Sequence, residues 1–442
     1  MPLLGLVIYV VFGRGLSQKT KKLVKIQKYR TKNYYNYLKT KSIEWGSDKN
    51  TKSEFSKQII DYVQNNYKNM YCSNNSVQIF TNGESKINEL KKDLTNAKQT
   101  INIQYYIFAD DDVGKQIMDI LCEKAKQGLK VKLLYDAVGS IKTPRKFFNK
   151  LKKYGGEVAV FFPPFFNIKI LNSKLNYRNH RKIVVIDGKI AYTGGINIRD
   201  DHMGKIKKLS PWRDTTIKLK GKIVWDLQNI FINDWLVCKK NENINQFTNN
   251  KYFNRQCLQN YGKLGAQIIS SGPEIKNNQI QDTYLKMLSI AKRYIYIQTP
   301  YLVPDENFLK ALEIAKKSGV DVKIIIPQKY DKKSVYTVSL AFAEQLTRLG
   351  VKIYAYNGFM HAKTLVVDDV VSIGTCNIDN RSFALNFELC VLIYDCNFVK
   401  KNIEIFVNDL QNSIFLSKEY FVKLTKKTKI LQCFYKLFSP LF

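Results

Sequence analysis

The chain carries one nine-residue pattern twice, and this repeat limits the folds that it can adopt more than any other feature. Residues 179–187 read NHRKIVVID, and residues 360–368 read MHAKTLVVD. In both copies a histidine and a lysine two positions apart are followed by four residues and an aspartate, and the copies are 361 − 180 = 181 residues apart. The matched residues are His180, Lys182 and Asp187 in the first copy and His361, Lys363 and Asp368 in the second. A long-range repeat of this kind predicts an internal duplication.

The segments before the two motifs share one order of predicted elements. Residues 101–108 (INIQYYIF) are rich in strand-forming residues, an amphipathic helix follows, and residues 129–136 (LKVKLLYD) form the next predicted strand. Residues 294–304, a helix with its own apolar face, and residues 320–327 repeat this order in the second half. The sequence therefore predicts an α/β protein built from two similar lobes.

The domain boundaries follow from composition. The stretch 239–256 is polar and rich in asparagine, which is typical of a linker. We expect a first lobe over residues 76–238, a linker over 239–262, and a second lobe over 263–442 that ends in a basic, aromatic tail. Residues 1–75 are expected to be a truncated membrane anchor and a connector.

The N-terminal stretch MPLLGLVIYVVFG has an apolar run of about 13 residues, whereas a bilayer-spanning helix needs roughly 20. Basic residues follow it at once, so the positive-inside rule places the rest of the chain on the cytoplasmic side of the cell membrane. The stretch is either an interfacial anchor or the end of a membrane helix. A buried strand or helix is the alternative.

The net charge and the spacing of the cysteines limit the classes of function that the chain can have. Lys and Arg exceed Asp and Glu by 71 − 37 = +34, which favours an anionic partner such as nucleic acid or an acidic lipid surface. The alternative source of this excess is a general composition bias, since Asn, Ile and Tyr are also abundant. The eight cysteines form no Cys-x-x-Cys pair and no zinc-type cluster with histidine, so we expect neither a metal site nor a disulfide framework.

The motif predicts a phosphate site when it is placed on a strand. His180 and Lys182 then share one face, while Asp187 has the opposite parity and precedes the turn residue Gly188. The hairpin brings Gly194 and Gly195 opposite the histidine end, where they leave room for a ligand. Just past the glycines of each copy stand Asn197 and Asn377. An imidazole, an ammonium and an amide on one face suit a phosphoryl group.

Other carboxylates are expected to orient the histidines. The turn aspartates Asp187 and Asp368 are read as structural, because they point away from their own histidines. Asp214 and Glu388 lie 34 and 27 residues after His180 and His361, far enough to stand on the strand beside each. The alternative for either acid is a surface or ion-paired role. His202 lacks a lysine partner and is expected to lie at the periphery of the site.

These motifs carry a resemblance to the phospholipase D superfamily, and more closely to bacterial cardiolipin synthases of that type. The matching text includes RNHRKIVVIDGKIAYTGGINI, PWRDT, TPYLVPD, HAKTLVVDD and CNIDNRSFALNFE, and covers roughly residues 78–395. The resemblance implies two lobes, each a mixed β-sheet flanked by helices, that meet about a pseudo-twofold axis with one site between them. Relatives usually carry two membrane spans ahead of the lobes, and this sequence matches only the end of the second.

The resemblance also implies a reaction without metal or cofactor. Two phosphatidylglycerols give cardiolipin and glycerol through a phosphohistidine, with His180 as nucleophile and His361 as acid and base. Lys182, Lys363, Asn197 and Asn377 would hold the phosphoryl oxygens. The expected partners are phosphatidylglycerol and a membrane surface, and not nucleic acid. The alternatives are a hydrolase, a transferase for another alcohol, a nuclease of the same superfamily, and an inactive membrane-binding module.

Two further segments suggest lipid contact. Residues 161–171 (FFPPFFNIKIL) either line an entrance for acyl chains or pack under the lobes. The C-terminal stretch KKTKILQCFYKLFSPLF alternates basic and large apolar residues. It either lies on a lipid surface or docks as a terminal helix.

Overall fold

The computed structural model describes residues 25, 52–162, 177–239, 241–274 and 278–439. The predicted membrane segment and most of the aromatic stretch at 161–171 lie outside these residues. Among the described residues, no helix combines the length and apolar character that crossing a membrane requires.

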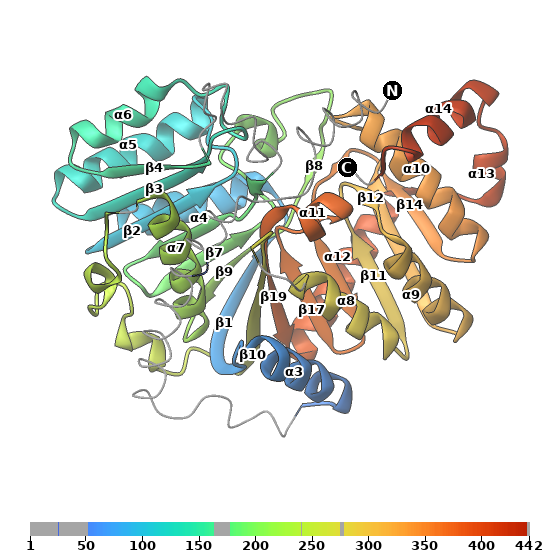
Figure 1. Cartoon of the computed structure of the whole chain (residues 1–442), viewed down its shortest axis with the longest axis horizontal. Coiled ribbons are helices and arrows are strands. Elements are labelled where there is room, and N and C mark those ends of the chain that lie inside the picture. The colour runs from blue at the N-terminus through green and yellow to red at the C-terminus, as the bar shows by residue number, and fades with distance from the viewer. Residues whose placement is uncertain (1–24, 26–51, 163–176, 240, 275–277, 440–442) are drawn as a thin grey trace.

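Two lobes lie side by side and share one continuous sheet (Figure 1). The first-lobe strands run in the order β1-β9-β7-β6-β2-β3-β4, and the second-lobe strands in the order β10-β19-β17-β16-β11-β13-β14-β20. The first seven strands of the two orders match one for one, and β1 pairs antiparallel with β10 at the junction. The internal duplication that the repeat predicted is therefore visible in the topology. Each lobe is a mixed sheet flanked by helices, as the family resemblance implied.

The first-lobe elements are β1 (Cys72–Phe80), α4 (Gly83–Thr95), β2 (Thr100–Tyr105), α5 (Asp112–Lys126), β3 (Lys130–Asp136), α6 (Arg145–Lys153), β4 (Glu157–Phe161), β5 (Arg178–Asn179), β6 (Ile183–Ile186), β7 (Ile190–Gly194), β8 (Trp212–Arg213), β9 (Thr216–Lys220) and α7 (Ile223–Cys238). The second-lobe elements are β10 (Leu264–Ser271), α8 (Gln279–Ser289), β11 (Tyr294–Gln298), β12 (Leu302–Val303), α9 (Glu306–Lys317), β13 (Asp321–Pro327), α10 (Lys333–Arg348), β14 (Lys352–Tyr356), β15 (Phe359–Met360), β16 (Thr364–Val367), β17 (Val370–Gly374), β18 (Ile378–Asp379), α11 (Asn380–Ala384), β19 (Asn386–Tyr394), α12 (Cys396–Gln411), β20 (Ser413–Phe415), α13 (Lys418–Val422) and α14 (Lys426–Lys436).

Local sequence explains the repeated helix–strand units. In α5 the apolar residues Val113, Ile117 and Leu121 recur at helical spacing and are buried against the sheet. The glycines that follow α5 and α9, Gly128 and Gly319, both have φ of +89°, a left-handed conformation that ends a helix at little cost for glycine. Each unit thus returns directly into a parallel strand, β3 or β13.

Two segments outside the predicted lobes pack closely on them. Helix α3 (Glu54–Tyr67), in the stretch expected to be a connector, joins the second-lobe core, and Tyr67 donates a hydrogen bond to Asp282 on α8. The stretch expected to be a linker buries Phe247, Tyr252 and Phe253 among first-lobe residues. The stretch 239–262 is therefore polar in overall composition but is attached to the protein by a few buried aromatic residues.

The turn aspartates hold the start of a neighbouring strand. Asp187 has φ of 52°, and its carboxylate accepts backbone N–H bonds from residues 98, 99 and 100 at 2.9, 2.7 and 2.9 Å. Asp368 has φ of 46° and accepts the equivalent bonds from residues 292, 293 and 294 at 2.8, 2.9 and 3.2 Å. These are the bonds expected of structural residues that tie a turn to neighbouring donors.

Candidate active site between the lobes

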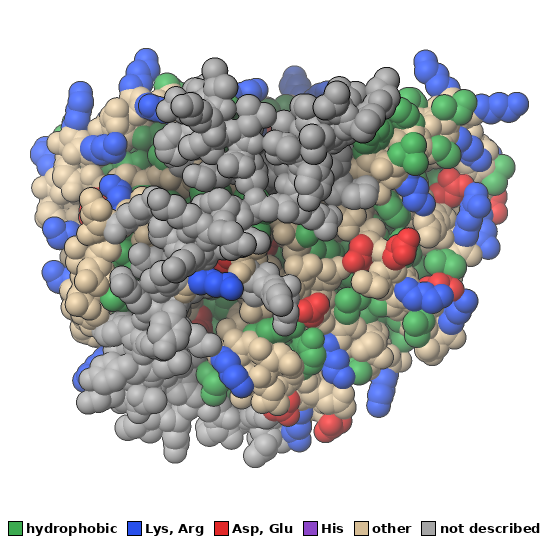
Figure 2. All heavy atoms as spheres, viewed as in Figure 1, with side chains coloured by type: hydrophobic (Ala, Val, Ile, Leu, Met, Phe, Trp, Pro, Cys, Tyr) green, Lys and Arg blue, Asp and Glu red, His purple; other side chains and the backbone are tan. Residues whose placement is uncertain are grey.

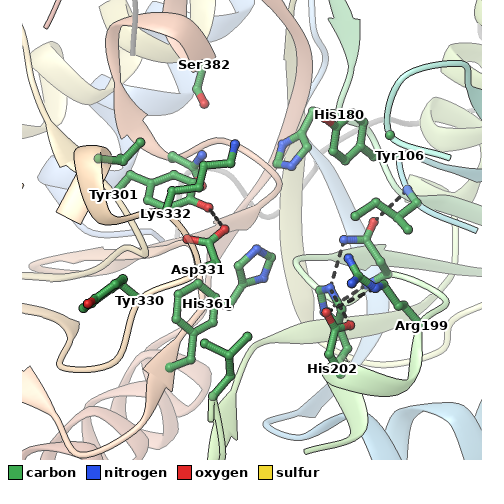
Figure 3. A pocket seen from close by; sticks show the side chains of 18 of the residues that line it. Tyr106, His180, Arg199, His202, Tyr301, Tyr330, Asp331, Lys332, His361 and Ser382 are labelled. Carbon is green, nitrogen blue, oxygen red and sulfur yellow. Dashed lines mark hydrogen bonds and ion pairs between the residues drawn. The ribbon is translucent and has the colours of Figure 1, made fainter. Parts of the chain in front are cut away.

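A cavity of about 710 Å³ lies where the two lobes meet, and both lobes line it. His180 comes from the first lobe, between β5 and β6, and His361 comes from the second, between β15 and β16. Figure 3 shows the two rings in the same hollow, with Tyr106 beside His180 and His202 on the first-lobe side. The duplicated motif has therefore been brought to one place, as predicted.

Each histidine hydrogen-bonds to the carboxylate of the opposite lobe. His180 Nδ1 donates to Glu388, at 2.9 and 3.1 Å from its two oxygens, and His361 Nδ1 donates to Asp214 Oδ2 at 2.6 Å. Both carboxylates are fully buried. The expectation that each acid serves the histidine of its own lobe was wrong.

Each histidine pairs with the carboxylate of the other lobe because short strands pair across the boundary between the lobes. β5, just before His180, pairs in parallel with β19, which carries Glu388, and His180 N donates to Phe387 O at 2.9 Å. β15, just before His361, pairs in parallel with β8, which precedes Asp214, and His361 N donates to Arg213 O at 2.6 Å. The backbone next to each histidine is thus a strand neighbour of the other lobe.

The supports of the two carboxylates differ. Glu388 accepts hydrogen bonds from the Thr375 hydroxyl and from Asn386 Nδ2. Asp214 lies against Gly195, where a Cβ atom would stand 2.0 Å from Asp214 Oδ1. When the β6–β7 hairpin is superposed on the β16–β17 hairpin by its strand register, Gly195 corresponds to Thr375. Gly195 was expected to make room for a ligand, but the room it leaves is taken by Asp214.

His202 was expected at the periphery, and this was wrong. It is buried, lines the cavity, and stands with its ring centre 5.1 Å from that of His361. Its Nδ1 lies 3.7 Å from Asp214 Oδ2, and its Nε2 lies 3.2 Å from the Asn197 amide nitrogen. The sequence did offer one signal for His202: it lies five residues after Asn197, which was itself predicted to be at the site.

Burial sets the protonation of the site. It lowers the pKa of His180 to about 4, although Glu388 works in the opposite direction, and it lowers the pKa of His361 well below its ordinary value. Burial also acts to raise the pKa of Asp214, but the neighbouring histidines and Lys363 outweigh it, and the net pKa is lowered. Both imidazoles are therefore neutral near pH 7, with the Nδ1 proton on the carboxylate side and Nε2 able to accept a proton or attack.

The motif lysines lie behind the histidines. Lys182 Nζ donates to His180 O at 2.7 Å, and Lys363 Nζ donates to His361 O at 2.5 Å. Both are buried, and burial lowers the pKa of Lys182 to about 7 and that of Lys363 to about 8. At pH 7 Lys363 is therefore mostly protonated and Lys182 about half protonated. The lining of the cavity includes neither lysine, so their charge acts on the site from beside the backbone of the two histidines.

The two asparagines both line the cavity. Asn197 Oδ1 accepts from Ile107 N at 3.2 Å, and Asn377 Nδ2 donates to Asp379 Oδ2 at 3.0 Å. Sequence reasoning missed five cationic residues that line the same cavity. They are Arg178, Arg199, Lys208, Lys332 and Arg381. Arg178 stands two residues before His180, so strand parity could have revealed it.

One group of described residues has the composition of a metal site: His202, Asp214 and His361, whose ligand atoms lie within 4.8 Å of one another. The 2.6 Å between Asp214 and His361 is a hydrogen-bond distance. Ligands that share a tetrahedral Zn²⁺ at ~2.0 Å stand about 3.3 Å apart, so the pair is set to share a proton rather than a metal.

The fold and the site define a two-lobed enzyme of the phospholipase D type. The family model described as "Cardiolipin synthase, PLD-like domain" matches residues 90–235 and 284–410. The chain is 39% identical to the major cardiolipin synthase ClsA of Bacillus subtilis strain 168 over all of its own length and 91% of the relative, and matches the cardiolipin synthase of Listeria monocytogenes serotype 4a at the same identity and coverage. The crystal structure of a phosphatidylserine synthase from Haemophilus influenzae Rd KW20 shares the fold, with a TM-score of 0.64, 15% identity, and coverage of 83% of this chain and 95% of that one.

The chain therefore belongs to the phospholipase D-like cardiolipin synthase family, and it is a phosphatidyltransferase of the phospholipase D superfamily. Its substrates are phospholipids.

Proposed function

We propose that this enzyme joins two phosphatidylglycerol molecules to give cardiolipin and glycerol at the membrane, with its lobes on the cytoplasmic side. One observation carries the proposal: two imidazoles line one cavity, and each has its Nδ1 held by a buried carboxylate. Such a pair leaves both Nε2 atoms free to work on opposite sides of one phosphorus.

In the first half of the reaction, His180 Nε2 attacks the phosphorus of the donor lipid. The phosphorus–oxygen bond to the terminal glycerol breaks, and His361 supplies the proton that the departing glycerol oxygen needs. A negative phosphodiester beside His361 raises the pKa of that imidazole, which favours the protonated form at this step. The phosphatidyl group is then held on His180.

In the second half, His361 accepts the proton of a hydroxyl on the second phosphatidylglycerol. That oxygen attacks phosphorus, the bond to His180 breaks, and cardiolipin forms. The two half-reactions are mirror images, so one acid–base residue serves both. His180 is assigned as nucleophile from the family resemblance.

The charge of the reacting group is balanced by the chain itself. Lys182 and Lys363 supply positive charge behind the histidines, and Asn197 and Asn377 offer amide donors at the cavity wall. Asp214 and Glu388 hold the tautomer and orientation of the two rings. No step needs a metal ion.

Product analysis tests the proposal. The full chain is incubated with radiolabelled phosphatidylglycerol in mixed micelles containing EDTA, and the lipids are resolved. We expect cardiolipin and free glycerol, at a rate that EDTA does not change. Phosphatidic acid alone would identify water as the acceptor and a hydrolase. Activity lost in EDTA and restored by Mg²⁺ would contradict the metal-free mechanism, and cleavage of nucleic acid in place of lipid would favour a nuclease.

A further inference from the structure

The surface formed by residues 414–438 is unusual for its exposed apolar side chains. Thirteen large hydrophobic residues are exposed in the part of the chain that the structure describes, and eight of them fall within these residues. The eight are Ile414, Phe415, Tyr420, Val422, Ile430, Phe434, Leu437 and Phe438. A concentration of exposed apolar side chains in one part of a protein is typical of an interaction site.

Helix α14 has its apolar stripe on the outside. Ile430, Phe434 and Leu437 recur at i, i+4 and i+7 and are 68%, 53% and 77% exposed, whereas Gln432 is the buried residue of the helix. An ordinary surface helix turns such a stripe towards the core. This helix docks through its other face, where Gln432 is buried and Tyr435 packs against the second-lobe core. On the same side Lys436 Nζ donates to Gln345 on α10 at 2.9 Å.

Positive charge surrounds the stripe. Residues 414–438 contain six lysines and one acid, Glu419. Figure 2 shows hydrophobic side chains gathered over α13 and α14, with basic side chains projecting around them. Lysines that flank exposed apolar residues on one helix fit an anionic lipid surface, whose headgroups pair with the ammonium groups while the apolar side chains enter the acyl boundary. A second copy of the same surface would repel it.

The surface lies next to the cavity. Asn380, the first residue of α11, donates to Ser439 O at 3.4 Å, and the next two residues of α11, Arg381 and Ser382, line the cavity. Across the cavity, Ile206 is 40% exposed at the wall, and Ile141 is 69% exposed in the turn that follows the cavity residues Val138 and Gly139. The first lobe therefore has an exposed apolar side chain at the cavity wall, and on the second lobe the 414–438 surface reaches the cavity through Ser439 and α11.

We propose that α14 is a docking helix that lies on the anionic bilayer and presents the cavity to it. The inference deepens the proposed function, because lipid substrates reside in such a bilayer, and it rests on that function for its purpose. Its physical content, insertion of the 430–437 stripe into anionic lipid, is measurable without any turnover.

Two exposed cysteines provide the direct test, one on the stripe (Cys433) and one at the start of α12 (Cys396). The full chain with Cys396→Ser is labelled at Cys433 with an environment-sensitive fluorophore, and the full chain with Cys433→Ser is labelled at Cys396 as the control. Vesicles of phosphatidylcholine, with or without phosphatidylserine, are then added. We expect a blue shift of the Cys433 label with the anionic vesicles, a smaller one at high salt, and none at Cys396. No shift at Cys433, or equal shifts at both sites, would overturn the proposal.

A second comparison links docking to activity. Ile430→Ser/Phe434→Ser/Leu437→Ser removes the stripe, and Ile314→Ser/Val407→Ser removes exposed residues of α9 and α12 as the control. Because all five side chains are exposed, both variants should fold. We expect the stripe variant to lose at least about tenfold in turnover of bilayer phosphatidylglycerol, with turnover of a monomeric short-chain phosphatidylglycerol unchanged. Unchanged bilayer turnover would overturn the proposal.

Two outcomes separate this proposal from its neighbours. If the Cys433 label enters the bilayer but no cardiolipin forms, docking stands and the proposed function fails. The second outcome combines two results: wild type sediments as a dimer and the stripe variant as a monomer, and the fluorescence of the Cys433 label does not change with vesicles. In that case a second copy of the chain occupies the surface, and the bilayer proposal is wrong.

Discussion

The half-site of His180 and the half-site of His361 repeat in backbone but differ in their side-chain supports. Around His180, Glu388 is held by a hydroxyl and an amide, from Thr375 and Asn386. Around His361, Asp214 is approached by a second imidazole, His202, and fits only because residue 195 has no side chain. The duplication thus preserved the positions of the reactive groups while the groups that hold them diverged, which suits a reaction in which the two histidines have different tasks.

Removing either histidine should have the largest effect. We expect His180→Ala and His361→Ala each to reduce phosphatidyl transfer by about 10⁴-fold or more, because each removes a reacting group. Radiolabelled product formation measures the loss, and thermal unfolding serves as the control for folding. Quenching with alkaline detergent, in which a phosphohistidine survives, should detect a phosphatidylated protein in wild type but not in His180→Ala; a phosphatidylated His180→Ala protein would reverse the assigned roles.

Replacing the carboxylate that each histidine receives from the other lobe should have the next largest effect. Asp214→Asn and Glu388→Gln should each reduce kcat by about 10²- to 10⁴-fold, since an amide no longer holds the reactive tautomer. A double-mutant cycle identifies the partner: adding Asp214→Asn to His361→Ala should cost little more, whereas adding Glu388→Gln should cost most of its own factor. The opposite pattern would restore the pairing within each lobe.

The different supports predict different sensitivities at one aligned position. Gly195→Ala places a Cβ against Asp214 and should displace that carboxylate from His361, lowering kcat by about 10²-fold. Thr375→Val removes one hydrogen bond from Glu388 and should cost about tenfold. Equal losses in steady-state kinetics would mean that the two half-sites are equivalent in their supports.

The turn aspartates should show the smallest effect on activity and a clear effect on stability. Asp187→Asn weakens three bonds from backbone N–H groups to a carboxylate, so we expect a loss of about 1–3 kcal/mol in the free energy of unfolding. Asp368→Asn should behave alike, because its bonds are the same. Denaturant titration measures both. A full loss of transfer in a folded Asp187→Asn protein would instead place this residue in the chemistry.

Much of this protein was determined by its sequence alone. The two-lobed α/β fold, the pair of histidines, the hairpins and the turn aspartates all follow from local patterns: a repeat, a period of two along a strand, and a turn residue at a fixed offset. Such features depend on a few adjacent residues, so they can be predicted without knowing where the rest of the chain lies.

Only the tertiary structure decided which carboxylate serves which histidine. Glu388 is 208 residues from His180, and Asp214 is 147 from His361, and nothing local distinguishes a partner in one lobe from a partner in the other. The crossing strands β5 and β15, and β8 with which β15 pairs, are each two residues long, too short to carry a periodic signal. The same reason explains His202 and the outward stripe of α14: burial and facing depend on what packs around a residue, and that is settled only when distant segments meet.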